Sequence, residues 1–366
     1  MKFYTLAIFT FFFSCVFAQA PQGYYNDAEN LSGFELKTAL HLIISENHFP
    51  QTYGSVWTFF ENNDANPDGT VKDIFSDCDF EFGPPEFGGN QDVGLGGNIE
   101  CEYFNREHTF PTSWFGGSNQ NALFTDIHHL YPADKYVNNV RSTFVFAEVN
   151  NPTFVSQNGS KLGPSSTSGL NGTAFEIVDE IKGDIARAFF YIATRYENEI
   201  EFWVGNNPDG DKILSGNAST AYQTWALNML YNWHLNDPVD QDEMDRNDAA
   251  FIFQGNRNPF VDHPEWICEV WNFEDSCTLS ANTFEADYSF SVYPNPVENG
   301  LLFIETQTEF TNFSIYNLSG KIMLQQENKS FQNEAIQLNL SNFKPGIYLV
   351  KAEINSQNIT KKIIVR

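Results

Sequence analysis

A glutamate and a histidine stand side by side in the stretch FNREHTFPTSWFGG, as Glu107 and His108. Further along, the segment DIHHLYPADKYVNNVRSTFVF, residues 126–146, carries Lys135, Asn138 and Arg141 at three-residue spacing, which places them near one face of a helix. Amide and carboxylate oxygens suit a hard cation such as Mg²⁺, while lysine and arginine suit a phosphate. A neutral imidazole can take a proton from water beside a carboxylate that holds a metal ion. Together these residues predict a metal-assisted phosphodiester hydrolase.

Each of these residues also has an ordinary structural interpretation. A Glu-His pair commonly lies at a solvated strand end, an asparagine in a helix is commonly exposed or a cap, and Arg141 is a candidate for a structural salt bridge. His128 and His129 are either a core and a surface residue or, in a rival hypothesis, the ligands of a zinc hydrolase. The co-occurrence of all these residues favours the phosphodiesterase interpretation.

The elements that must position these residues are helices and a proline-containing turn. Pro132 suits the first turn of a helix, where its missing N–H costs nothing, so a short helix is expected behind it. The spacing of apolar residues predicts further helices over 31–46, 183–198 and 221–237. We interpret these as the shell around the site.

The N-terminus and the cysteines indicate export. Residues 1–18 have the charged start, short apolar core and small-residue end of a signal peptide, and no later run has the roughly 20 apolar residues of a membrane helix. In an oxidising compartment the four remaining cysteines favour disulfides. The short loops favour Cys78 with Cys101 and Cys268 with Cys277; a four-cysteine zinc site is the alternative, although CxxC pairs are absent.

Charge is unevenly distributed along the chain. The formal net charge is −27, but residues 19–290 carry 12 basic and 41 acidic side chains, whereas the remainder to residue 366 is nearly neutral. This acidity argues against broad electrostatic attraction to a polyanion, so binding to nucleic acid would need divalent cations and a local neutral or basic cleft. The stretch 64–75 begins like a calcium-binding loop, but Phe75 replaces the glutamate at its twelfth position, so we expect a turn, with a weak calcium site as the alternative.

The C-terminal stretch has a separate character. Short β-type runs such as LLFIET, NFSIYN and GIYLVKAEI are divided by turn residues, the pattern of a small β-sandwich. With YPNP at 293–296, IYNLSGK at 315–321, KPGIYLVK at 344–351 and the basic end KKIIVR, residues 291–366 resemble the C-terminal sorting domain of proteins exported by the type IX secretion system. The resemblance implies passage across the outer membrane through that machinery. An ordinary carbohydrate-binding or adhesive sandwich is the alternative.

The preceding region resembles the secreted and periplasmic endonuclease I nucleases, which have a ββα-metal active-site motif. The resemblance rests on five ordered blocks: CEYFNREHTFPTSWFGG, DIHHLYPADKYVNNVRS, FEIVDEIKGDIARAFFYIATRYE, WHLNDPVDQDEMDRND and GNRNPFVDHPE. It implies that Glu107 and Asn138 are Mg²⁺ ligands and that His108 is the general base. It also implies cleavage of DNA, and often RNA, to 5′-phosphate products with little sequence preference.

Further roles follow from the same resemblance. Some members place a phosphate-binding arginine between the Glu-His pair and the D-x-H block, but TFPTSWFGGSNQNALFT contains no basic residue, so Arg141 and Lys135 are the candidates to replace it. Orientation of the metal-binding and catalytic side chains, or contact with nucleic acid, is expected for the following residues: Arg106, Asp126, His128, Lys135, Arg257 and His263.

We therefore expect an α+β protein with a mostly helical nuclease domain at 19–280, a linker at 281–290 and an all-β sandwich at 291–366. The predicted activity is that of a secreted, non-specific endonuclease that acts on DNA or RNA as a monomer. Mg²⁺ is the expected cofactor, with Ca²⁺ or Mn²⁺ as alternatives. The competing hypothesis is a catalytically lapsed surface protein that keeps the nuclease fold for adhesion.

Overall fold

The computed structural model describes residues 20–273, 291–297, 300–305, 310–317, 321–326, 336–344, 346–354 and 357–366. The chain divides into two compact units, 1–277 and 278–366. The predicted signal peptide 1–18, the predicted linker 281–290 and Cys277 lie outside the described residues.

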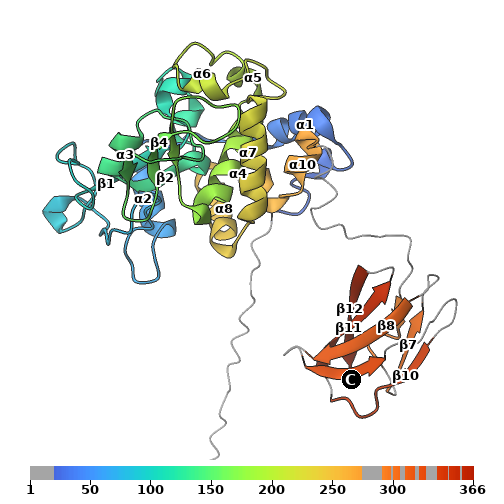
Figure 1. The fold of residues 1–366 in the computed structure, drawn as a ribbon. Helices are drawn as coiled ribbons and strands as arrows, with labels where there is room; N and C mark the ends of the chain where they lie inside the picture. The colour runs from blue at the N-terminus through green and yellow to red at the C-terminus, as the bar shows by residue number, and fades with distance from the viewer. Residues whose placement is uncertain are drawn as a thin grey trace, which may run out of the picture. The chain divides into compact units, whose positions relative to one another are not determined.

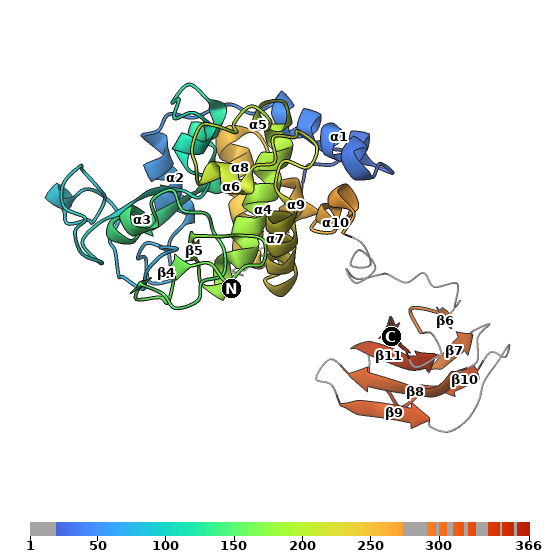
Figure 2. The ribbon, with the colours of Figure 1, turned by 45° about the horizontal axis from the view of Figure 1, so that its top comes forward.

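Helices form the frame of the first unit (Figures 1 and 2). They are α1 (Gly33–Glu46), α2 (Ser55–Asn63), α3 (Lys135–Arg141), α4 (Asp179–Arg195), α5 (Glu197–Ile200), α6 (Gly210–Ile213), α7 (Thr224–Asn236), α8 (Gln241–Gln254), α9 (Pro259–Asp262) and α10 (Trp266–Trp271). The predicted helices at 31–46, 183–198 and 221–237 correspond to α1, to α4 with α5, and to α7. Helix α4 is buried on every side from Ile185 to Thr194, because α1 and α7 both pack against it.

Two small antiparallel sheets accompany the helices. Strands β1 (Phe104–His108) and β2 (Leu130–Asp134) form one, and β3 (Phe154–Val155), β4 (Lys161–Pro164) and β5 (Thr173–Glu176) form the other. Residues 64–103 contain little regular structure. The first unit is therefore mixed α+β, and the expectation of a mostly helical domain is not supported.

The site residues lie on the β1–β2 pair and on α3, which follows β2 directly (Figure 1). In the register of the two strands, Glu107 lies opposite Tyr131 and His108 opposite Leu130. The expectation that Pro132 begins the helix is wrong, because Pro132 lies within β2 and α3 starts at Lys135. The helix is capped instead by Asp134, whose side chain accepts a hydrogen bond from the Val137 N–H at 2.9 Å.

The start of β2 and the segment before it are held by Arg246 of α8. Its guanidinium donates to the carbonyls of Ile127 at 2.9 Å and Leu130 at 2.7 Å. It also pairs with Asp64 at 2.8 Å. Asp64 begins the stretch that resembled a calcium loop, and the backbone there turns between Asn66 and Gly69 at 2.9 Å. The predicted turn is confirmed, and the carboxylate of Asp64 forms a salt bridge with Arg246.

The second unit is all-β. Its strands are β6 (Ser291–Tyr293), β7 (Leu301–Glu305), β8 (Phe310–Asn317), β9 (Ile322–Gln326), β10 (Ile336–Asn339), β11 (Gly346–Ile354) and β12 (Gln357–Val365). They form two sheets, ordered β10-β7-β6 and β12-β11-β8-β9. Buried side chains of both sheets, including Ile304, Ile315 and Val350, share one apolar cluster, as in a β-sandwich. Among the described residues of either unit, no helix is long and apolar enough to cross a membrane.

Candidate active site

Strand β1 presents its side chains to two different environments. Successive residues of a strand point to opposite faces, so Asn105 and Glu107 face α3 whereas Arg106 and His108 face the segment around Tyr53 and Phe124. The Glu-His pair therefore brings a carboxylate and an imidazole to the same strand end from its two sides.

Glu107 is a buried carboxylate whose neighbours are polar. It is only 2% exposed, and its Oε1 accepts a hydrogen bond from Arg141 at 2.8 Å. Burial raises the pKa of Glu107 to about 7, against the opposing influence of Arg141 and of a hydrogen bond from Asn138. A carboxylate of this kind is readily stabilised in its charged form by an additional cation.

The amides beside Glu107 suit a hard cation. The Asn138 amide nitrogen donates to Asn105 Oδ1 at 2.9 Å, and among the described residues no donor reaches the Asn138 amide oxygen. Asn138 on α3 and Asn105 and Glu107 on β1 thus offer only oxygen as donor atoms for a metal ion, the chemistry that Mg²⁺ and Ca²⁺ prefer. The residues present fit a divalent metal.

His108 is held in one tautomer. Its Nε2 lies 2.9 Å from the Phe124 carbonyl oxygen, which can only accept, so Nε2 carries the proton and Nδ1 keeps its lone pair. Burial, with a further contribution from His129, lowers the pKa of His108 to about 3. The imidazole is therefore neutral near pH 7. No described residue donates to Nδ1, which is free to accept a proton.

Arg141 lies behind the site. It is 1% exposed and donates to the backbone carbonyls of His108 at 3.1 Å and Thr109 at 2.8 Å, in addition to Glu107. This geometry favours a positioning role rather than contact with a phosphate. Lys135, the other candidate for the missing arginine, is paired with Asp92 at 2.8 Å and bonds the Leu95 carbonyl at 2.9 Å.

Arg106 has a different environment from these two cations. Its guanidinium lies 3.4 Å from the centre of the Tyr53 ring and 4.4 Å from that of Trp57, and it donates to the Tyr53 carbonyl. Within the described part of the chain, no carboxylate forms a salt bridge with Arg106. It lies on the His108 face of β1 and retains donors for an anion.

Asp126 links the segment after β1 to the helical frame. It accepts hydrogen bonds from Tyr191 and Tyr196, each at 2.8 Å, and from Gln254 at 2.8 Å. Burial alone would raise the pKa of Asp126, but the nearby imidazoles of His48 and His128 hold it well below its usual range. Asp126 is thus an ionised anchor, remote from solvent.

His128 and His129 do not form a zinc pair. The Nε2 of His128 bonds the Asn256 carbonyl at 3.3 Å, and that of His129 bonds the Leu123 carbonyl at 2.7 Å. Both rings are buried, and burial lowers both pKa values, to about 4 for His128. This geometry favours a role as buried structural residues over a role as zinc ligands.

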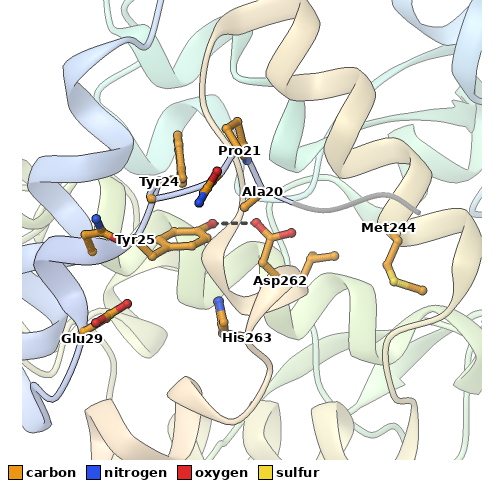
Figure 3. Close-up of a pocket in the computed structure, with 12 residues that line it drawn as sticks. Ala20, Pro21, Tyr24, Tyr25, Glu29, Met244, Asp262 and His263 are labelled. Carbon is orange, nitrogen blue, oxygen red and sulfur yellow. Dashed lines mark hydrogen bonds between the residues drawn. The ribbon is translucent and has the colours of Figure 1, made fainter. Parts of the chain in front are cut away.

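Two residues from the last sequence block lie elsewhere. Arg257 is 2% exposed and binds Asp262 with two hydrogen bonds of 2.7 Å, a geometry that favours fixing the loop. His263 stacks on Trp266 with ring centres 3.9 Å apart and lines a pocket of about 470 Å³. Figure 3 shows this pocket, where the Tyr25 hydroxyl points at Asp262 beside His263.

The Cys78–Cys101 pairing is present as a disulfide. The Asp134 carboxylate accepts a hydrogen bond from the Cys101 N–H at 2.6 Å, so the disulfide reaches the cap of α3. The two sulfurs and an Asp134 oxygen lie within 4.8 Å of one another, as metal ligands do. Because the sulfurs are bonded to each other, they are not available as thiolate ligands.

Sequence reasoning missed several partners of the site. Tyr53 comes from a turn and the Phe124 carbonyl from a short 3-10 helix (Ala122–Thr125), and the approach of either to β1 has no local signal. Asn105 was detectable, because it stands two residues before Glu107 and so shares its face of a strand.

Comparisons with known proteins identify two regions of the chain. Residues 32–265 match the family model for Endonuclease I, and residues 291–366 match that for a secretion system C-terminal sorting domain. An extracellular ribonuclease of Bacillus amyloliquefaciens is 36% identical over 252 residues, which cover 68% of this chain and 78% of the relative. An extracellular ribonuclease of Bacillus subtilis is 34% identical over the same length and shares of the two chains. The chain, a nuclease with a type IX sorting domain, belongs to the endonuclease I family.

Proposed function

We propose that this protein is a metal-dependent endonuclease that hydrolyses phosphodiester bonds in both DNA and RNA outside the cell. The observation that carries the proposal is the end of β1, where buried Glu107 faces half-buried Asn138 of α3 on one side and neutral His108 lies on the other. Oxygen ligands for a cation and a base for water thus meet at one strand end.

In this proposal, each side chain has a distinct task. His108 takes a proton from the attacking water at Nδ1, while the Phe124 carbonyl keeps the ring oriented through Nε2. Glu107 and Asn138 hold the metal, and Arg141 keeps the Glu107 carboxylate and the end of β1 in place. When bound, Mg²⁺ would supply charge stabilisation at the phosphate and at the leaving oxygen.

Arg106 is the residue that we propose for contact with the phosphate. Its guanidinium is partly exposed, lies on the His108 face and stacks on Tyr53 instead of pairing with a carboxylate. In an acidic unit such a local cation is needed to hold a polyanion near the base. It would replace the arginine that is missing from the segment after His108.

Water attack explains why one site would accept both nucleic acids. A ribonuclease that uses the 2′-hydroxyl as nucleophile cannot cut DNA, whereas a base that activates water needs no 2′-hydroxyl. Both Bacillus relatives are described as extracellular ribonucleases, which supports RNA as a substrate. We expect 5′-phosphate ends on both products.

Cleavage of supercoiled plasmid and of an RNA oligonucleotide by the full chain tests the proposal, with Mg²⁺ and with EDTA. His108→Ala should slow both reactions by about 10²- to 10⁴-fold. His263→Ala, which removes a histidine from the remote pocket, serves as the matched control and should retain activity. Cleavage unaffected by EDTA, or RNA products with 2′,3′-cyclic phosphate ends, would contradict the mechanism. No cleavage of either substrate would favour a catalytically lapsed surface protein.

A further inference from the structure

A second set of carboxylates gathers in a pocket of about 180 Å³ that residues of α4, α8 and β2 line. We call it the acidic pocket: its carboxylates include Glu180 and Asp184 of α4 and Asp240, Asp242 and Glu243 at the start of α8. Seven carboxylates and two cationic side chains line it. None of the proposed catalytic residues is among them.

The two cations of the acidic pocket already have partners. Lys72 pairs with Asp242 at 2.7 Å, and Arg246 pairs with Asp64 at 2.8 Å. Behind the pocket wall, buried Arg187 is shared by Asp184 at 3.0 Å and Glu243 at 2.7 Å. One guanidinium therefore serves two carboxylates, and burial together with the neighbouring Asp184 raises the pKa of Glu243 to about 8.

Local structure explains only part of this acidity. Asp240 caps α8 by accepting from the Glu243 N–H at 2.9 Å, and acidic residues in a first turn favour the helix dipole. Neither helix capping nor the helix dipole explains why the Oε2 atom of Glu243 is buried at this place. The Glu243 residue is 9% exposed, and this oxygen is buried without a hydrogen-bond partner among the described residues. A buried carboxylate oxygen without a donor is costly unless a cation or a water satisfies it.

We propose that the acidic pocket binds a hydrated divalent cation, Mg²⁺ or Ca²⁺, through Glu243 Oε2 and Asp184. In the described residues, no three carboxylates of the pocket each bring an oxygen within 4.8 Å of the others, so water completes the coordination. Hard cations held by one or two carboxylates commonly keep several waters. Because Asp184 is on α4 and Glu243 on α8, the ion links two helices of the frame that supports β2.

Calorimetric titration of the full chain with CaCl₂ and with MgCl₂ tests the inference. The Glu107→Gln background removes a ligand of the proposed catalytic metal, so the remaining binding reports the acidic pocket. In that background one ion should still bind, and adding Glu243→Gln or Asp184→Asn should weaken it by at least about tenfold. Adding Glu201→Gln, at an exposed carboxylate elsewhere, is the charge-matched control and should leave binding unchanged.

Thermal unfolding gives a second readout that does not depend on nuclease activity. The ion should raise the Tm of the Glu107→Gln chain by roughly 5–10 °C at a concentration 100-fold above its Kd, and this rise should vanish with Glu243→Gln. Near-ultraviolet circular dichroism checks that each variant is folded. Binding of neither ion in the Glu107→Gln chain, or binding that both pocket substitutions leave intact, would overturn the inference and leave Glu243 Oε2 to a buried water.

Discussion

Replacing Arg141 by methionine should destabilise the nuclease unit by about 3–5 kcal/mol at pH 8, because one side of a buried ion pair is removed. The guanidinium donates to Glu107 at 2.8 Å and to the carbonyls of His108 at 3.1 Å and Thr109 at 2.8 Å. Methionine fills the space but supplies no donor. Glu107 can relieve part of the cost by taking a proton, since burial already raises its pKa to about 7. The loss should therefore be smaller at pH 6 than at pH 8.

Urea unfolding followed by tryptophan fluorescence measures this loss in the full chain, because all 7 tryptophans precede residue 278. The matched variants are Glu107→Gln alone and Glu107→Gln combined with Arg141→Met. The double-mutant cycle should give a coupling free energy between the two residues of at least about 1 kcal/mol. In the activity assay kcat should fall while KM stays within about threefold. A destabilisation under about 1 kcal/mol, or a raised KM with kcat retained, would refute the positioning role and return Arg141 to the substrate side.

Three further predictions concern the metal, the disulfide and the charge. Metal affinity should fall about tenfold per pH unit below pH 7, since the raised pKa of Glu107 means that a proton competes with the metal for the carboxylate; calorimetry at pH 5.5 and pH 8 measures this, and equal affinities would contradict it. The paired substitution Cys78→Ser and Cys101→Ser opens a loop of sequence separation 23 and should cost about 3 kcal/mol in urea unfolding, whereas an unchanged midpoint would show that the disulfide is dispensable. Because the nuclease unit is strongly acidic, kcat/KM on DNA should rise as NaCl is increased from about 0.01 to 0.2 M at fixed Mg²⁺; a steady fall would indicate a basic binding surface instead.

The parts of the site that the sequence predicted are those with local signals. Glu107 and His108 lie in one short segment and Asn138 in another, and the structure brings them to adjoining elements. The proline rule misplaced the helix start because Pro132 is paired in β2, where the partner strand and Arg246 hold the chain extended. Local helix preference cannot outweigh such tertiary contacts.

The remaining features depend on burial and long-range contact, which composition does not contain. The spacing of Arg141 and Lys135 suggested that both face a phosphate. In the structure, Arg141 is buried against β1 and Lys135 forms an ion pair with Asp92. Asp126 and His128 were recognised as supporting residues, but their partners Tyr191 and Gln254 lie 65 and 128 positions from Asp126. Only the folded chain reveals such pairs.

The contact of Arg246 with β2 has a consequence for the cell that makes this protein. The carbonyls of Ile127 and Leu130 accept hydrogen bonds from Arg246, which is synthesised more than 110 residues after them. A chain interrupted before α8 would contain every proposed ligand and base but lack the clamp on the strand beside them. We expect such fragments to be harmless to the host's own nucleic acids, so that the order of synthesis itself delays a toxic activity until the chain is nearly ready for export.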